Sequence, residues 1–277
     1  MNAHSVSITI VVDNQCGSGL TAEHGLALYI ESEGRRALFD TGQGRALADN
    51  ARALGIKLET IDTLVLSHGH YDHTGGLATV LHAAAVDLYC HPGVTQPRYA
   101  IRNGGAKAIH MPHVAMAAMD KVSEKRLHWV LEPVMLSPTI GITGPIPRQS
   151  DFEDAGGPFY LDPEGRRADP LADDMALYIQ TALGLVVCVG CCHAGLVNTL
   201  NHVRRLNDNA PVFAVIGGFH LLHAGIRRLE QTIHALRVVT PHMIVPCHCT
   251  GEHAVAVLSD SLGQRVVPGA AGMTLRF

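Results

Sequence analysis

The sequence has no excess of positive charge, and this lack argues against two classes of partner. Lys and Arg contribute 21 residues and Asp and Glu contribute 25, which gives a formal net charge of −4. We therefore expect neither nucleic acid nor a membrane as a partner. Charged residues make up only 17% of the 277 residues and hydrophobic residues make up 47%, so the chain can bury a substantial core and disorder is not expected.

Long hydrophobic runs and well-spaced cysteine pairs are also missing. The segment 5–13 is short and interrupted by Ser and Thr, so we expect neither a signal peptide nor a membrane span. The seven cysteines include the adjacent Cys191 and Cys192, and Cys247 and Cys249, which one histidine separates. Such neighbours strain the geometry of a disulfide. We therefore expect reduced thiols and a cytoplasmic protein.

Two common catalytic motifs are absent from the sequence. It contains no Gly-x-Ser-x-Gly and no phosphate-cradling loop, so a serine nucleophile or a nucleotide-driven mechanism has little support. Histidine is abundant instead, with 18 residues. That number is too large for one site, so several histidines must have ordinary surface or core positions.

The densest histidine cluster lies in residues 68–73. His68, His70, Asp72 and His73 place four potential metal ligands in six positions. They follow the apolar segment 63–67, which predicts a buried parallel strand, so the ligands are expected on the loop at the carboxyl end of that strand. We do not expect this loop to be helical, because residues two apart would point to different faces of a helix. A polar loop that is merely rich in histidine is the less favoured interpretation.

This His-x-His-x-Asp-His motif resembles the signature of the metallo-β-lactamase fold superfamily. The segments 23–26 and 38–42 resemble early segments of that family. Three later segments resemble one branch of it, that of 7,8-dihydropterin-6-yl-methyl-4-(β-D-ribofuranosyl)aminobenzene 5'-phosphate synthase; they are 190–195, 217–221 and 246–251. The resemblance implies an αβ/βα sandwich of two mixed β-sheets with outer helices.

The order of predicted elements agrees with this α/β (α+β) class. Strands and helices alternate over 6–90 and again over 175–262, with a hairpin signal at 32–34. We expect residues 1–277 to form a single domain. Residues 92–174 are rich in proline and irregular, and we interpret them as an insertion that covers the active-site face. A purely structural excursion or a dimer contact is the alternative.

Beyond the motif, two further ligands are assigned. His193 follows the apolar strand 185–189, although a histidine there could also cap the next helix. For His248 the resemblance decides, because the last ligand of the superfamily is a histidine in this place, while the flanking Cys247 and Cys249 remain alternative thiolate ligands. The first metal is expected to bind His68, His70 and His193, and the second Asp72, His73 and His248.

Other residues near the expected site have open roles. Cys191 lies where many relatives carry a metal-bridging aspartate, and it is either a ligand or a buried thiol. His220 either binds substrate, donates a proton or is structural. By resemblance, Asp40 supports the ligand loop from behind and His24 lies near the site. Asp72 and His220 are the expected catalytic residues, Asp72 orienting the attacking water.

The ligand set favours hydrolysis. Two divalent transition-metal ions, Zn²⁺ first and Fe or Mn as alternatives, would activate water to attack an ester, phosphoester or related bond of a small molecule. A transferase of the synthase type is the first alternative. A diiron redox protein and a non-catalytic small-molecule sensor are weaker alternatives. The sequence leaves the substrate and the presence of a homo-oligomer open.

Overall fold

The computed structural model describes residues 6–277. By their internal contacts these residues divide into two compact units. Within the described residues, unit 1 runs to Leu131 and adds Pro158–Asp173 and Ala270–Phe277. Unit 2 comprises Glu132–Gly157 and Asp174–Gly269. The segment 92–174 is thus shared between the two units, and the expectation of a single domain over 1–277 stays a prediction.

Unit 1 contains a seven-stranded mixed sheet in the order β16-β1-β2-β3-β4-β5-β8. Its first half is antiparallel, and the strands from β3 to β8 run parallel to one another. Glu33 and Gly34, both at positive φ, form the expected turn between β2 and β3. The strands are β1 Ser7–Val12, β2 Ala27–Ser32, β3 Arg35–Phe39, β4 Thr63–Val65, β5 Asp87–Cys90, β8 Leu127–Trp129 and β16 Thr274–Arg276.

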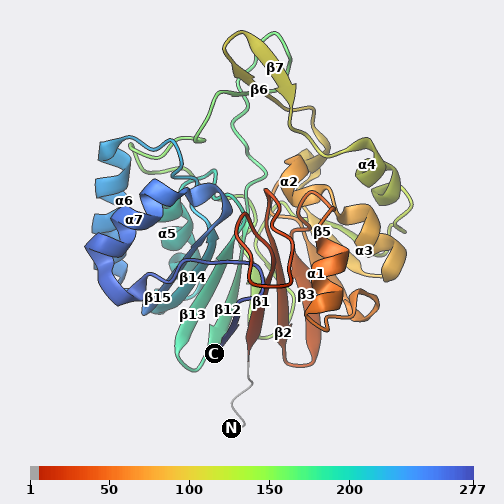
Figure 1. Cartoon of the computed structure of the whole chain (residues 1–277), viewed down its shortest axis with the longest axis horizontal. Helices are drawn as coiled ribbons and strands as arrows, with labels where there is room; N and C mark the ends of the chain where they lie inside the picture. Colours follow the sequence, from red (N-terminus) through yellow and green to blue (C-terminus); the bar gives the residue numbers. More distant parts are fainter. Residues whose placement is uncertain (1–5) are drawn as a thin grey trace. The chain divides into compact units, whose positions relative to one another are not determined.

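Short helices accompany the parallel part of this sheet (Figure 1). Their apolar residues join those of β3, β4 and β5 in one buried cluster, which includes Leu47, Leu64, Leu77 and Leu88. The helices are α1 Leu47–Ala53, α2 Tyr71–Thr74, α3 Leu77–Ala83 and α4 His113–Met119, with single turns η1 Leu58–Thr60 and η2 Pro92–Thr95. The expectation of a wholly non-helical ligand loop is wrong for its second half, because α2 forms one turn at Tyr71–Thr74.

A small three-stranded sheet also belongs to unit 1, in the order β11-β6-β7. It consists of the hairpin β6 Tyr99–Arg102 and β7 Gly105–Ala108, labelled in Figure 1, and of β11 Phe159–Tyr160. The chain leaving β7 reaches the ligand loop, since the Tyr71 backbone N–H donates to the Ile109 carbonyl at 3.0 Å. Part of the segment 92–174 therefore lies directly against the histidine motif.

Unit 2 contains a six-stranded mixed sheet in the order β15-β14-β13-β12-β10-β9. Strands β13, β14 and β15 are parallel, and the others pair antiparallel. The strands are β9 Val134–Met135, β10 Ile140–Ile142, β12 Ala176–Thr181, β13 Gly184–Val189, β14 Val212–Gly218 and β15 Met243–Cys247. The strand expected at 185–189 is present as β13, and strands and helices alternate over 175–262 as expected.

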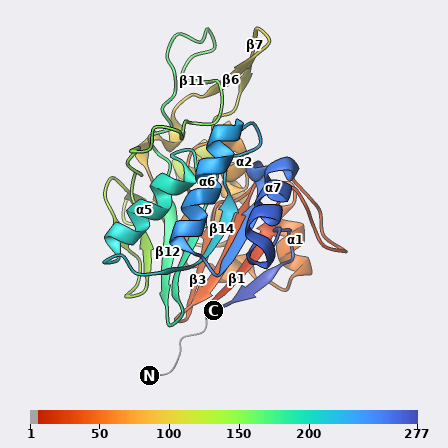
Figure 2. The same ribbon diagram turned by 90° about the vertical axis from the view of Figure 1, so that its left-hand side faces the viewer.

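Three long helices pack on one face of this second sheet (Figure 2). They are α5 Leu196–Leu206, α6 Ile226–Val239 and α7 Glu252–Leu262, and single turns η3 His248–Thr250 and η4 Gly263–Arg265 flank the last of them. Leu200, Leu236 and Leu258 pack with Val187 and Val215 of the sheet in a buried core. The α/β class with mixed sheets is confirmed. No helix in the described part of the chain has both the length and the apolar character needed to cross a bilayer.

Candidate metal-binding residues

The ligand loop of unit 1 begins where β4 ends, and the buried Asp40 carboxylate organises it. Asp40 Oδ1 accepts the backbone N–H of Ser67 at 2.7 Å. Its Oδ2 accepts the Ser67 hydroxyl at 2.6 Å and His73 Nδ1 at 2.7 Å. Ser67 Oγ also lies 2.9 Å from Nδ1 of His68. One carboxylate thus fixes the Nδ1 side of His73 directly and that of His68 through a hydroxyl, which leaves Nε2 as the ligand atom of both rings.

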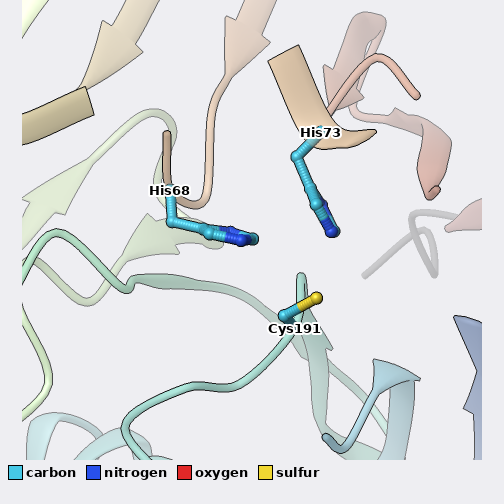
Figure 3. A group of neighbouring side chains, drawn as sticks. All are labelled: His68, His73 and Cys191. Carbon is cyan, nitrogen blue, oxygen red and sulfur yellow. The ribbon is translucent and has the colours of Figure 1, made fainter. Parts of the chain in front are cut away.

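The three imidazole rings of the loop lie close together. The ring centroids of His68 and His73 are 4.3 Å apart, and those of His68 and His70 are 4.6 Å apart. Figure 3 shows His68 on the loop after β4 and His73 on the turn of α2. All three side chains are almost fully buried. Buried rings crowded at this distance are costly unless their nitrogens have partners, and a bound metal ion would supply one.

The backbone of the loop is clamped by the segment that follows β3. The His73 carbonyl accepts both the backbone N–H and the hydroxyl of Thr41, each at 2.8 Å. Gly25 packs so close to the Asp72 carbonyl that a Cβ would lie 2.4 Å from its oxygen. Asp40 itself has φ 62°, a left-handed conformation that aspartate tolerates better than most residues. These contacts explain why the segments 23–26 and 38–42 accompany the motif in the sequence.

A buried ion cluster holds the middle of the same loop. The Gly69 backbone N–H, between His68 and His70, donates to Asp173 Oδ2 at 2.8 Å. Asp173 is bound in turn by two nitrogens of Arg98, at 2.6 and 2.8 Å, and Arg98 Nε lies 2.9 Å from Asp169 Oδ2. Arg98 is only 1% exposed. The cluster connects the fold of the segment 92–174 to the position of the histidine motif.

Asp72 points to a different partner from the histidines. Its Oδ2 lies 3.2 Å from Nε2 of His24, whose side chain is half exposed. The expectation that His24 lies near the motif is therefore met within unit 1. Lys107 places its ammonium 5.1 Å from the centre of the Tyr71 ring, and the Phe159 ring lies 5.3 Å from that of His70. The motif thus has aromatic and cationic neighbours from the segment 92–174.

In unit 2 the candidate residues follow the ends of three adjacent parallel strands. His193 follows β13, His220 follows β14 and His248 follows β15. Carboxyl ends of neighbouring parallel strands meet at one edge of a sheet, where α/β proteins place their sites. Cys192, His220 and His248 have φ of 58°, 48° and 47°. Left-handed backbone at non-glycine residues costs free energy and clusters at functional sites, and here it occurs at all three strand ends.

His193 is fully buried and held by the segment 148–174. Its Nδ1 donates to the Ala155 carbonyl at 2.8 Å, so Nε2 is the available ligand atom. Arg148 donates to the His193 carbonyl at 2.7 Å, and the Ala194 N–H donates to Asp174 Oδ2 at 2.6 Å. The alternative that His193 caps α5 is not supported, because the Glu153 carboxylate accepts the N–H groups of the first turn of that helix.

His220 lies beside His193 rather than apart from it. The two ring centroids are 4.3 Å apart, and His220 Nε2 lies 3.2 Å from the Gly156 carbonyl oxygen. Cys191, His193 and His220 offer three ligand atoms within 4.8 Å of one another. Figure 3 shows Cys191 at the end of its strand. His220 is therefore grouped with potential ligands, and its role as proton donor, substrate-binding or structural residue stays a prediction.

Cys249, one of the two alternative thiolate ligands beside His248, is as close to potential ligands as Cys191 is. Cys191, His248 and Cys249 form a second group with ligand atoms within 4.8 Å of one another. Burial disfavours ionisation of Cys249, but its hydrogen bond with Cys191 and the nearby His248 and His220 hold its pKa well below the usual thiol range. Burial raises the pKa of Cys188 to about 12 and that of Cys192 well above its ordinary value.

The structure thus supplies residues suited to metal in both units. Imidazoles with one nitrogen anchored, a buried carboxylate behind them, and thiols near a histidine fit divalent transition metals. Which ion each residue binds stays a prediction for His68, His70, Asp72, His73, His193 and His248. Sequence reasoning missed Arg98, Asp169, Asp173, Asp174 and Glu153. No motif marks them, because each acts through contacts with residues far away in the sequence.

Comparisons with known proteins agree with this donor chemistry. Residues 20–126 match the family described as the metallo-beta-lactamase superfamily. The chain is 29% identical to the 7,8-dihydropterin-6-methyl-4-(beta-D-ribofuranosyl)-aminobenzene-5'-phosphate synthase of Methanocaldococcus jannaschii, over 99% of this chain and 97% of the relative. An uncharacterized protein of the same organism is 31% identical, over 91% of this chain and 94% of the relative.

One solved structure is similar over its whole length. It is a metal-dependent hydrolase of the beta-lactamase superfamily, with a TM-score of 0.82, 27% sequence identity and 98% of each chain covered. The signature motif, the sheet architecture and these matches together show that the chain belongs to the metallo-β-lactamase superfamily.

Proposed function

We propose that the protein is a metal-dependent hydrolase that cleaves an ester, phosphoester or related bond of a small molecule. The observation that carries the proposal is the buried Asp40 carboxylate, which orients His73 directly and His68 through Ser67. A carboxylate behind a histidine sets its tautomer and strengthens it as a ligand. The similar metal-dependent hydrolase adds support from outside the chain.

Six side chains are proposed to bind two divalent ions. His68, His70 and His193 are assigned to the first, and Asp72, His73 and His248 to the second. Three ligands for each ion leave open positions, which suits a catalytic site rather than a closed structural one. Zn²⁺ is the favoured ion, because five of the six proposed ligands are imidazoles, and Fe and Mn are the alternatives.

Bound ions would supply Lewis acidity, lowering the pKa of a water molecule and polarising the bond to be cleaved. Residues of the chain would orient the water molecule and donate a proton to the leaving group. Asp72 is proposed to accept a hydrogen bond from the attacking water and so orient it, and the half-exposed His24 lies 3.2 Å from this carboxylate. His220 is proposed to donate a proton to the leaving group. Its ring nitrogens and partly exposed position suit a group that exchanges protons.

A transferase is the second candidate, and one observation favours it. The relative that matches 99% of this chain is a synthase of a dihydropterin aminobenzene ribosyl phosphate. At 29% identity the two proteins can share a fold and ligands and still differ in the group that accepts the cleaved fragment. Water would be the acceptor in the hydrolase, and an aromatic compound in the transferase. A sensor without turnover is the third candidate.

The test is metal analysis of the purified protein together with a panel of generic esters and phosphoesters. We expect close to two transition-metal ions for each chain, as the proposed ligand sets require. His70→Ala should lose at least one ion and all turnover, whereas the matched control His82→Ala, on the exposed surface of α3, should keep both. Parent-rate turnover by chelator-treated or His70→Ala protein would exclude the metal mechanism. Metal without turnover of any ester would favour the transferase or the sensor.

A further inference from the structure

Sulfur donors form a group of their own at the strand ends of unit 2. Cys191 follows β13, and Cys249 lies in the η3 turn directly after His248. The two Sγ atoms and a ring nitrogen of His248 all lie within 4.8 Å of one another. The three residues are almost fully buried, with exposures of 2%, 6% and 7% for Cys191, His248 and Cys249. Two thiols and an imidazole at this spacing can bind one ion without large movement.

The position of the Cys249 side chain depends on a glycine, Gly218. Gly218 lies at the end of β14, between the ends of β13 and β15. A Cβ on Gly218 would lie 2.5 Å from Cys249 Sγ and 2.6 Å from the Gly190 carbonyl oxygen. Any other residue would therefore displace the Cys249 side chain. With glycine there, Cys249 Sγ lies 3.6 Å from the Cys191 carbonyl oxygen.

Other cysteines of unit 2 have different surroundings. Cys192 Sγ lies 3.3 Å from the Thr199 hydroxyl and belongs to the apolar core. Cys188 is fully buried within β13. Cys247 Sγ lies 3.5 Å from the Val245 carbonyl. The grouping of Cys191 and Cys249 with His248 is therefore not a consequence of a general abundance of sulfur, and these neighbours provide matched controls.

We propose that Cys191, His248 and Cys249 form a thiolate-bearing site for a thiophilic divalent ion, Zn²⁺ or Cd²⁺ rather than Mg²⁺ or Mn²⁺. Thiolates favour soft ions, and three protein ligands leave a fourth position open. Each thiol gives its proton to solvent when the ion binds. The site rests on the proposed function in one respect, because His248 is also a ligand of the proposed second metal. An ion held by the two thiolates would bind His248 in place of that metal, and the sulfur ligands determine the class of ion that binds there.

Cadmium titration of the metal-free, full-length protein tests this site. Thiolate-to-cadmium charge transfer absorbs in the ultraviolet, so the band reports sulfur ligation independently of turnover. We expect a saturable band in the parent protein that Zn²⁺ removes by competition and Mg²⁺ does not. Cys191→Ser and Cys249→Ser should each reduce the band by about half, because each removes one of two metal–sulfur bonds. Cys192→Ser should leave it unchanged.

The outcomes separate this site from the hydrolase proposal. A parent protein without the band overturns the thiolate site with no variant needed, even if it hydrolyses esters. A band that survives both Cys191→Ser and Cys249→Ser, or that disappears in Cys192→Ser, also overturns it. A saturable band in a parent protein that turns over no ester or phosphoester, even when loaded with metal, would support the thiolate site while the hydrolase proposal fails. Circular dichroism of each variant confirms that it is folded.

Discussion

The two units hold their candidate ligands by different physical means. In unit 1 the ligand loop is fixed by buried charge, with Asp40 behind two histidines and the Arg98 cluster behind Gly69. In unit 2 the ligands follow strand ends where Cys192, His220 and His248 adopt left-handed backbone. Removing one partner of a buried charge destabilises the folded protein, whereas replacing a strained residue by glycine relieves the strain. Loss of a charge partner in unit 1 should therefore lower the free energy of unfolding, and glycine at a strained residue of unit 2 should be more stable than alanine there.

The largest effect is expected from breaking the ion cluster of unit 1. Arg98→Met leaves Asp169 and Asp173 buried without their cation, which should lower the free energy of unfolding by roughly 3–5 kcal/mol. Urea denaturation of the metal-free protein measures this. The control is Arg52→Met, because Arg52 is 77% exposed in its ion pair with Asp49. Removing such an exposed pair should cost less than about 1 kcal/mol. Equal losses in the two variants would contradict the assignment of a stabilising cluster.

A smaller effect is expected from the carboxylate behind the histidines. Asparagine tolerates the left-handed backbone of residue 40, but its amide cannot replace both acceptor oxygens. Asp40→Asn should therefore weaken Zn²⁺ binding by roughly 10- to 100-fold while the protein stays folded. Competition with a chromophoric chelator measures the affinity. Asp87→Asn is the control, since the half-exposed Asp87 carboxylate pairs with His128 and not with a histidine of the motif. Unchanged affinity in Asp40→Asn would remove the main support for the metal site.

The elements around the histidine motif could be predicted from the sequence, whereas the buried ion cluster of Arg98 could not. The strand–loop–helix around residues 63–85 follows from an apolar run, a dense set of ligands and a helical pattern, all local in sequence. The Arg98 cluster is not local: Arg98 and Asp173 are far apart in the chain, and neither belongs to a motif. Asp173 and Asp174 are adjacent, yet Asp173 accepts the Gly69 N–H and Asp174 accepts the Ala194 N–H. Only the fold reveals that consecutive aspartates support different ligand segments.

The backbone strain in unit 2 could not be predicted from the sequence either, because it also depends on contacts between distant residues. Glycine at positive φ can be guessed from its position in a turn, as at Gly34. Histidine or cysteine at positive φ is held there by tertiary contacts, such as the bond from the Phe219 N–H to the Thr250 hydroxyl after β14 and β15. The histidines themselves were predictable from their places after apolar strands, but their conformations were not.

The third prediction compares glycine with alanine at one ligand position in each unit, where the more stable variant should differ. At His248, with φ 47°, glycine relieves the strain that alanine keeps. Metal-free His248→Gly should therefore be about 0.5–1 kcal/mol more stable than His248→Ala, after allowing for the greater freedom of glycine in the unfolded chain. At His73, inside the turn of α2, the order should reverse, and the alanine variant should be the more stable. Urea denaturation of the four variants compares the units directly.

Thr240 provides the control for this prediction, because it ends α6 at φ 53° on the exposed surface. Glycine should also be preferred to alanine there, without any effect on metal binding. If alanine were preferred at both His248 and Thr240, positive φ would not be a source of strain in unit 2. The contrast between the units would then depend on buried charge alone.

The smallest effect concerns a property that the two units share. Burial lowers the pKa of His91 in unit 1 and of His202 in unit 2 below the ordinary value of 6.5. A histidine whose pKa is lower in the folded state favours folding while it is neutral, so its contribution is present above pH 6.5 and decreases as the pH falls through that value. His202 Nε2 lies 3.2 Å from the Thr143 carbonyl oxygen, and a glutamine side chain can still donate a hydrogen bond there. His91 Nδ1 accepts the Gly93 N–H at 3.0 Å, and an asparagine oxygen can replace it.

We therefore expect His91→Asn and His202→Gln each to flatten slightly the loss of stability of the metal-free protein between about pH 7 and 5. His82→Asn, at an exposed position on α3, should leave that pH dependence unchanged. A steeper loss of stability in either buried-site variant would show that the native histidine is protonated in the folded protein, opposite to the effect expected from its burial.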